Sequence, residues 1–175
     1  MSGGQFGGLI GDLLGHPFRT VIFAGKFLAF THLFFEYGIQ TAPAQGPSML
    51  PTFELLGQWL VVSRRHRFGR NVEVGDLVAY NIPVDENVGV KRILGLPGDY
   101  VMLDTPGRES QAMIQVPQGH CWIVGDNLAA SRDSRYFGPV PLALIRGKVV
   151  ATIKPFHFQW VEKNLFHREN RSPAN

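Results

Sequence analysis

A serine set between two prolines is the first residue of the chain whose setting could support chemistry. Ser48 lies in the segment 46–52, which reads Gly-Pro-Ser-Met-Leu-Pro-Thr. The prolines stiffen this segment, and Gly46 lets a second backbone approach closely. Such a loop can hold a hydroxyl in one exposed position, as a nucleophile requires. Taken alone, the segment is more typical of an ordinary turn, because serine and proline are common turn residues.

A lysine inside a predicted strand could serve that hydroxyl as a base. Lys91 and Arg92 are adjacent in the segment 88–94. Because alternate side chains of a strand share a face, one of these two cations must lie among apolar neighbours. The ordinary lysine pKa of about 10.4 must fall to about 7 for the amine to act as a base near neutrality, and burial can cause such a fall. The alternative is an edge strand from which both side chains extend to solvent.

A third segment, 125–140, is dense in small polar residues and follows an apolar run. It reads Gly-Asp-Asn-Leu-Ala-Ala-Ser-Arg-Asp-Ser-Arg-Tyr-Phe-Gly-Pro-Val. Within it, Asp133 and Arg135 would share a face if the backbone were extended. Without further information, the segment is typical of a long surface loop with Asx and Ser turns.

An apolar stretch near the N-terminus predicts a membrane anchor over 16–40, preceded by a flexible lead over 1–15. About twenty helical residues at ~1.5 Å each span a ~30 Å bilayer core, and the stretch 18–39 has that length. Lys26, His32 and Glu36 weaken the prediction, because a charge at the centre of a membrane helix costs roughly 2.5–3.5 kcal/mol. The alternative is an amphipathic helix that lies on the membrane or packs on a core. No small-residue cleavage site follows, so we expect a retained anchor.

Beyond residue 41 the pattern changes to short apolar runs separated by turn residues, which predicts β-strands. The expected strands are 59–62, 77–80, 88–94, 100–103, 113–116, 121–124 and 144–153. Clusters of Gly, Pro, Asp and Asn between them are typical of tight turns. We therefore expect a mainly β protein: a compact coiled sheet or barrel that forms one catalytic domain over 41–157, with one N-terminal membrane helix and a polar C-terminal tail over 158–175.

Charge and composition narrow the classes of function. The formal net charge is +3, and the basic residues are scattered except for the run 63–67, Ser-Arg-Arg-His-Arg. Nucleic-acid binding is therefore not expected. The run is expected to be a solvated loop, and its alternative role is contact with acidic lipid headgroups.

Cysteine and histidine usage bears on disulfides, metals and cofactors. Cys121 is the only cysteine, which excludes an internal disulfide and a thiolate metal cluster. We expect it to pack in a strand as a small apolar side chain. The six histidines show no metal-ligand spacing, so we expect neither a metal nor a cofactor.

Together, the three polar segments resemble the type I signal peptidases. The resemblance rests on Ser-Met-x-Pro-Thr starting at Ser48, on the Lys-Arg pair at 91–92 before Gly-Leu-Pro-Gly-Asp, and on Gly-Asp-Asn…Ser-x-Asp-Ser-Arg starting at Gly125. It covers residues 35–155. It implies a serine endopeptidase, because a Ser-Lys pair is a known variant of the serine triad that needs no histidine.

The resemblance also implies a role for each residue that matches the family's motifs. Ser48 would be the nucleophile, Lys91 its general base, and Ser131 would orient Lys91 by a hydrogen bond. Asp133 and Arg135 would form a structural ion pair.

The chain departs from the family at two places. Some bacterial members carry a hydroxyl two residues before the nucleophile, where this chain has Gly46 in the substrate and oxyanion loop. Pro47 has no N–H, so the Ser48 backbone N–H is expected to be the main donor to the oxyanion. The other departure is a short turn over 104–112, where many bacterial members insert a further β region.

Within the family, the chain resembles the members of the mitochondrial inner membrane. Features such as Phe-Glu-Tyr at 35–37 and Val-Pro-Gln-Gly-His at 116–120 suggest it. This implies removal of targeting presequences from precursor proteins sorted to the intermembrane space. It also implies contact with membrane lipid and a heterodimer with a related second catalytic subunit. Arg19 at the helix start favours an N-terminus in the matrix and a catalytic domain in the intermembrane space.

Three alternatives stay open at this point. One is a bacterial or endoplasmic-reticulum signal peptidase. Another is a repressor-type autoprotease, which would need an N-terminal DNA-binding domain where this chain has an apolar stretch. The last is a catalytically inactive membrane-bound scaffold subunit, which the presence of both Ser48 and Lys91 disfavours.

Overall fold

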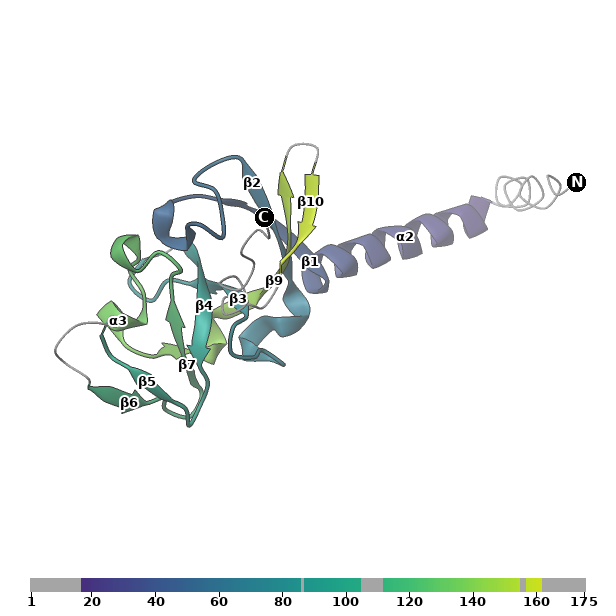
Figure 1. Ribbon diagram of the computed structural model, residues 1–175. Helices are drawn as coiled ribbons and strands as arrows, with labels where there is room; N and C mark the ends of the chain where they lie inside the picture. The colour runs from purple at the N-terminus through teal and green to yellow at the C-terminus, as the bar shows by residue number, and fades with distance from the viewer. Residues whose placement is uncertain (1–16, 86, 105–111, 155–156, 162–175) are drawn as a thin grey trace, which may run out of the picture. The chain divides into compact units, whose positions relative to one another are not determined.

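The computed structural model describes residues 17–85, 87–104, 112–154 and 157–161 (Figure 1). The chain divides into two compact units, one up to Gly38 and one from Ile39 onward. The expected lead over 1–15 and most of the expected tail over 158–175 lie outside the described residues.

The first unit contains the helix α2 (Pro17–Tyr37). Proline suits the first position of a helix, where no backbone N–H is needed. The large apolar side chains of α2 are exposed, and the helix is long and apolar enough to cross a membrane. The predicted helix end at Ile39 is two residues too late, because Ile39 begins a strand.

The second unit is built on one curled antiparallel sheet (Figure 1). Its strand order is β1-β2-β9-β3-β4-β7-β8, and β10 pairs with the far end of β9. A separate two-stranded sheet pairs β5 with β6. The strands are β1 (Ile39–Ala44), β2 (Gln58–Ser63), β3 (Leu77–Asn81), β4 (Val88–Gly95), β5 (Tyr100–Met102), β6 (Met113–Gln115), β7 (His120–Val124), β8 (Val140–Pro141), β9 (Ile145–Lys154) and β10 (His157–Trp160).

Short helical turns connect these strands. They are η1 (Pro47–Met49), η2 (Arg64–Gly69), η3 (Leu128–Ala130), α3 (Ser134–Phe137) and η4 (Leu142–Leu144). The run of basic residues predicted as a solvated loop therefore forms η2, a pair of 3-10 turns with a kink between them.

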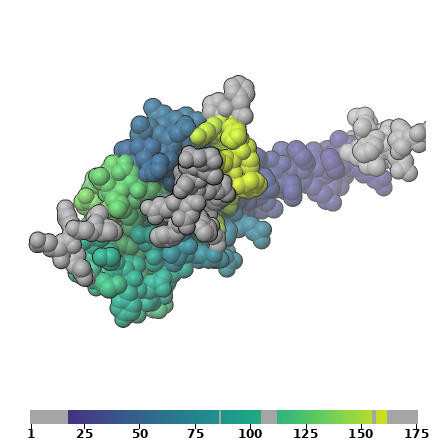
Figure 2. Space-filling model, in the orientation of Figure 1, coloured from purple at the N-terminus to yellow at the C-terminus, as the bar shows by residue number. Residues whose placement is uncertain are grey.

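The prediction of a mainly β fold with one N-terminal apolar helix is confirmed. Each of the seven expected strands is present, with ends that differ by one residue at most. Three strands were not predicted: β1, β8 and β10. β10 begins at the boundary drawn between the catalytic domain and the tail, and all four of its residues are exposed, as the yellow strand at the surface shows (Figure 2).

The sheet buries side chains on both of its faces, which explains why its central strands are apolar throughout. In β3, Leu77 and Ala79 join one cluster together with Met49 and Phe53 of the connection 45–57, which carries Ser48 and is called the serine loop below. The alternate residues Val78 and Tyr80 join a cluster on the other face with Ile93, Cys121 and Ile123. Alternation of side chains along a strand produces this division. Each fully buried large apolar side chain contributes about 1.5–3 kcal/mol, so the centre of the sheet is a rigid platform.

Cys121 packs as expected, buried within β7. Its Sγ donates to the backbone oxygen of Val140 at 3.5 Å. Burial raises the pKa of this thiol to about 12, which keeps it protonated and unreactive.

Candidate active site

Ser48 lies on the single 3-10 turn η1, between the unpredicted strand β1 and β2. The expectation that the first strand would be 59–62, after Ser48, is therefore wrong. The side chains that follow it anchor the loop: Met49 and Phe53 are each 4% exposed and belong to the core. The Phe53 N–H also donates to the Met49 oxygen at 2.9 Å. Ser48 itself is half-buried, so its hydroxyl is held on an anchored loop at the edge of the core.

Asn127, in the segment after β7, holds this loop by two hydrogen bonds, which are called the Asn127 clamp below. The backbone N–H of Asn127 donates to the Ser48 oxygen at 3.0 Å. The Asn127 side chain donates from Nδ2 to the Pro47 oxygen at 3.1 Å. Both bonds reach backbone carbonyls of the serine loop, so they fix the position of Ser48 without using its hydroxyl.

Lys91 reaches that hydroxyl from the interior of the sheet. β4 lies between β3 and β7, so the alternative of an edge strand is wrong. Lys91 is only 6% exposed, and its Nζ lies 2.7 Å from Ser48 Oγ. A second contact, 3.2 Å from Nζ to the Val90 oxygen, restricts the amine further. The structure thus brings together two residues that are 43 positions apart in the chain.

The electrostatic setting of Lys91 favours the neutral amine. Burial lowers the pKa of Lys91 from its ordinary value of 10.5, and this effect outweighs the opposing influence of Asp133 and Asp126. A neutral amine carries a lone pair that can accept the proton of a neighbouring hydroxyl. The pair Ser48 and Lys91 therefore has the geometry that a nucleophile and its base require, and the lowered pKa of Lys91 shifts the amine in the direction of that role.

The neighbouring cation, Arg92, is buried as well, at 3% exposure. Its Nε and Nη2 donate to the two carboxylate oxygens of Asp126 at 2.9 and 2.8 Å, and its Nη1 donates to the Gly75 oxygen at 2.7 Å. Asp126 also accepts from the Thr52 hydroxyl of the serine loop. This network ties the serine loop to the strand that carries Lys91.

Sequence reasoning missed this network and the Asn127 clamp. One signal was available for Arg92, since a cation beside Lys91 in a strand must point to the opposite face and needs a buried acid there. Thr52 belongs to the Ser-Met-x-Pro-Thr motif, but no signal in the sequence paired it with Asp126, which lies 74 residues away.

Asp133 is the centre of a second network near the pair Ser48 and Lys91, which is called the dyad below. Its carboxylate is fully buried and accepts from the Ser131 hydroxyl at 2.6 Å, from the Gly125 N–H at 2.9 Å and from Arg135 Nε at 2.8 Å. Burial raises the pKa of Asp133, but the hydrogen bonds from Arg135, Gly125 and Ser131 outweigh it and hold the pKa below its ordinary value. Asp133 and Arg135 form an ion pair at 2.8 Å, although only Asp133 has an extended backbone: it caps the short helix α3, which contains Arg135.

A hydrogen bond between Ser131 and Lys91 was predicted. In the structure, the Ser131 hydroxyl donates to Asp133 instead. A hydroxyl has one proton and two acceptor lone pairs, so Ser131 can still accept from Lys91 Nζ. Its role in orienting Lys91 remains a prediction.

Gly46 precedes the turn with a positive φ of 97°, a conformation that favours glycine. It is exposed, and its N–H donates to the Leu55 oxygen at 3.4 Å. Gly46 therefore shapes the entry to the loop, and oxyanion binding by the Ser48 N–H remains a prediction.

Gly125 is the position in the site where there is no space for a side chain. A Cβ at this position would lie 2.5 Å from the Ser48 oxygen and 2.6 Å from Ser131 Cβ. The Ser48 oxygen is backbone and is already bonded to Asn127, so it cannot rotate away. Any side chain at 125 must displace the serine loop or the Asp133 network.

We therefore expect Gly125→Ala to lower kcat of any reaction that uses the Ser48 hydroxyl by about a hundredfold, since a displacement of about 1 Å is enough for such a loss. The crowding should also destabilise the fold by about 1–3 kcal/mol. Cleavage assays and the thermal midpoint in detergent measure the two effects. Gly25→Ala is the matched control, because a Cβ there meets nothing within 4 Å. Unchanged turnover in Gly125→Ala would contradict the geometry of the site.

Within the described ranges, no group of three or more His, Cys, Asp or Glu side chains is placed to hold a metal ion. The chemistry available from the described side chains of the site is therefore that of a hydroxyl, an amine and two carboxylates held by arginines.

This arrangement agrees with the family to which the sequence is matched. The family model described as "Signal peptidase, peptidase S26" matches residues 18–108 and 102–154. The chain belongs to this signal peptidase family, whose members are serine peptidases.

Within the family, the chain is similar to subunit 1 of the mitochondrial inner membrane protease. It is 41% identical over 150 residues to that subunit of Schizosaccharomyces pombe, an alignment that covers 85% of this chain and 94% of the relative. It is 43% identical over 142 residues to the mitochondrial ATP-independent inner membrane protease subunit 1a of Arabidopsis thaliana, covering 79% and 84% of the two chains. The mitochondrial inner membrane protease subunit 2 of S. pombe is 32% identical over 124 residues, covering 69% and 68%.

Proposed function

We propose that this chain is a membrane-anchored serine endopeptidase in which Ser48 is the nucleophile and Lys91 the general base. It removes targeting presequences from precursor proteins sorted to the mitochondrial intermembrane space. The observation that carries the proposal is the 2.7 Å contact between Lys91 Nζ and Ser48 Oγ at a lysine that is almost fully buried. A catalytically inactive scaffold would have no need to keep a lysine in this costly position.

The reaction begins when neutral Lys91 accepts the proton of Ser48 as Oγ attacks the scissile carbonyl. The Oγ–C bond forms, and the developing oxyanion accepts a hydrogen bond from the Ser48 N–H. Lys91 then gives its proton to the leaving amine as the C–N bond breaks, which leaves an acyl-enzyme. Water attacks this ester while Lys91 accepts its proton. The C–Oγ bond then breaks, Lys91 returns the proton to Ser48 Oγ, and the acyl product leaves as the carboxylic acid.

The substrate binds as an extended strand next to the serine loop. β1 is at one end of the sheet order and leads into that loop, and the strand pairing described for it is with β2. Its burial alternates along the strand, so its outer edge can pair with a peptide while shallow pockets contact alternate side chains. Pro43 is tolerated in β1 because an edge strand can lack a donor.

The helix and the relatives support a proposal for membrane attachment, location and partner. α2 spans the inner membrane, with Arg19 on the matrix side and the catalytic domain in the intermembrane space. The similarity to both subunits of an inner membrane protease supports a heterodimer with a second catalytic subunit.

The proposal is tested with the full chain purified together with a second subunit whose own nucleophile is replaced by alanine. We expect this complex to cut a presequence-bearing precursor at one bond, which mass spectrometry of the new N-terminus identifies. The chain should be assayed alone in parallel, to show whether it needs the partner. If cleavage appears only when the second subunit is wild type, this chain is a scaffold and the proposal is wrong.

A further inference from the structure

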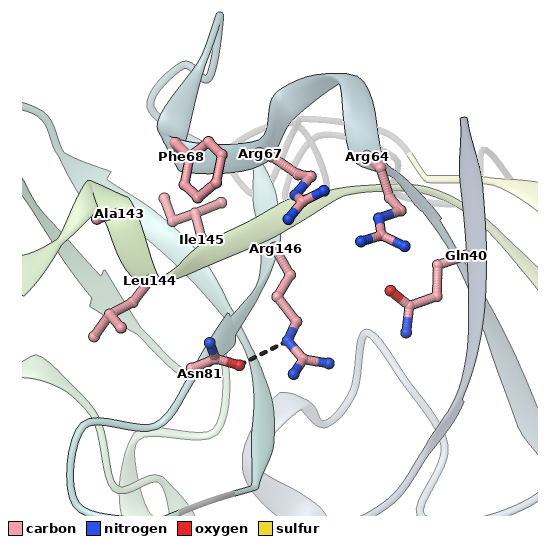
Figure 3. A pocket seen from close by; sticks show the side chains of 9 residues that line it. All are labelled: Gln40, Arg64, Arg67, Phe68, Asn81, Ala143, Leu144, Ile145 and Arg146. Atoms are coloured by element: carbon pink, nitrogen blue, oxygen red, sulfur yellow. Dashed lines mark hydrogen bonds between the residues drawn. The ribbon is translucent and has the colours of Figure 1, made fainter. Parts of the chain in front are cut away.

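The guanidinium groups of Arg64, Arg67 and Arg146 are turned toward one pocket of about 290 Å³ in the sheet domain (Figure 3). Arg146 Nε donates to Asn81 Oδ1 at 2.6 Å. Arg64 and Arg67 also have partners, and the Arg67 guanidinium carbon lies 5.1 Å from the centre of the Phe68 ring. Because these cations are engaged within the chain, the pocket does not point to a ligand.

Lys26, in the helix α2, differs from those arginines because it has no partner among the described residues. It is exposed, and in the described part of the chain it makes no hydrogen bond or ion pair. The only acidic residue of α2 is Glu36, ten residues further on, which is about 15 Å along the helix axis. A lysine side chain reaches about 6 Å and a glutamate side chain less, so the two cannot meet within α2.

Lys26 also lies too deep in the helix for its charge to reach water. Figure 1 shows α2 as one unbroken helix, and its 21 residues give it about the length of the bilayer core. Lys26 is nine residues from Pro17, so the nearer end of α2 is about 14 Å away. A side chain with a reach of about 6 Å cannot extend that far, so the ammonium group stays in the hydrocarbon.

The side chains on the same face as Lys26 suit contact with another helix. Ile22, Ala29 and Leu33 share this face, because they are four residues before, three after and seven after Lys26. Ala29 is small, so a second backbone can approach closely beside the lysine. Charged side chains inside a membrane pair with one another or face a protein interior. The face therefore has the chemistry of a helix contact in which a carboxylate lies opposite Lys26.

A second copy of this chain does not supply that carboxylate. Its α2 would cross the membrane in the same direction, so its Glu36 would again lie about 15 Å from the level of Lys26. The acid must therefore belong to a different membrane helix.

We propose that the Lys26 ammonium group forms an ion pair with an aspartate or glutamate on a membrane helix of the second subunit. This inference rests on the proposed function, in which α2 spans the membrane next to that subunit. It assigns the contact to the face of Ile22, Lys26, Ala29 and Leu33. The ion pair would hold the two subunits together within the bilayer, independently of the chemistry at Ser48.

The test uses the full chain, tagged and expressed with the second subunit, and measures how much second subunit is recovered with it in mild detergent. We expect Lys26→Leu to lower the recovery about tenfold, because the buried carboxylate loses its partner. Lys26→Arg, which keeps the charge, should retain the complex.

The double variant Lys26→Leu with Leu28→Lys is the matched control for composition. It moves the lysine by about 200° around the helix at almost the same depth, from one face to the opposite one. Its overall hydropathy and charge are those of the wild type. We expect its recovery of the second subunit to be as low as that of Lys26→Leu, because the position of the charge decides the contact.

Cross-linking identifies the acid. A photoreactive residue in place of Ala29 should form a product with a membrane segment of the second subunit that contains an aspartate or glutamate, and the same residue in place of Leu28 should not. Replacement of that acid by leucine should match the effect of Lys26→Leu. Combining its replacement by lysine with Lys26→Glu should restore the recovery.

Full recovery with Lys26→Leu or with the double variant would overturn the inference and leave the proposed protease intact. A cross-linked segment without an acid would also overturn it. If the wild type recovers no second subunit, the proposed heterodimer fails and the inference fails with it. Precursor cleavage, assayed on the wild-type complex, tests the proposed protease separately. Carbonate extraction shows whether each variant is inserted in the membrane; if Lys26→Leu is not, the double variant decides.

Discussion

Replacement of Ser48 by alanine is expected to reduce presequence cleavage by roughly 10⁶-fold, the loss seen when the nucleophile of a serine protease is removed. Alanine has no oxygen to form the acyl-enzyme, and Lys91 loses the hydroxyl that it contacts at 2.7 Å. The loop should keep its shape, because Met49 and Phe53 anchor it and Asn127 holds it through backbone oxygens. Initial rates on a precursor, together with the thermal midpoint, measure the two properties.

Ser63→Ala is the matched control for this variant. Ser63 precedes η2, is half-buried like Ser48, and makes no side-chain cap hydrogen bond there. Its replacement should leave turnover unchanged. Combining Ser48→Ala with Lys91→Met should add no further loss, because residues that act as a unit are not additive. Turnover of Ser48→Ala within tenfold of wild type would mean that another group attacks the substrate.

Replacement of Lys91 is expected to lower kcat by about 10²–10⁴-fold, the usual contribution of a general base. Lys91→Arg tests the base directly, because arginine is never deprotonated in this pH range and so cannot accept a proton. In the wild type, turnover should rise with pH as Lys91 loses its proton, with a midpoint below the ordinary lysine value of 10.5. A pH profile of kcat, measured in wild type and Lys91→Arg, shows whether this rise disappears with the lysine.

Lys91 supports catalysis in the proposed mechanism, but its burial should lower the stability of the fold. Because the folded pKa of Lys91 is lowered, the unfolded chain binds more protons between the folded pKa and 10.5. Stability must therefore increase with pH across that window, and protonation of Lys91 opposes folding below it. Lys91→Met removes this cost, so its thermal midpoint at neutral pH should equal or exceed that of the wild type. A large fall in the midpoint would show that Lys91 stabilises the fold instead.

The parts of the fold that the sequence predicted are those with strong local patterns. The apolar runs of β2, β3, β4, β7 and β9 are bounded by turn residues, and all of them form strands. β1 could not be found this way, because Ile-Gln-Thr-Ala-Pro-Ala has a weak local preference for a strand and forms one by pairing with β2. The short β8 is similarly defined by its pairing with β7.

The residues of the site show the same division between what local sequence patterns predict and what only long-range pairing specifies. Ser48 and Lys91 stand in short motifs, so resemblance to a family of proteases is enough to single them out. The partners that hold them could not be paired from the sequence: Arg92 with Asp126, Thr52 with Asp126, and Asn127 with the serine loop. These contacts join residues 34 to 80 positions apart, and only the fold specifies which donor meets which acceptor.

The Asn127 clamp has a consequence for how this lineage can evolve. Its hydrogen bonds go to main-chain oxygens of the serine loop, so they do not depend on the side chain at position 48. A single base change could silence a duplicated gene while its product still folds and assembles. Architecture alone therefore does not distinguish a working copy from a silent paralogue, and the residue at 48 must be inspected in each.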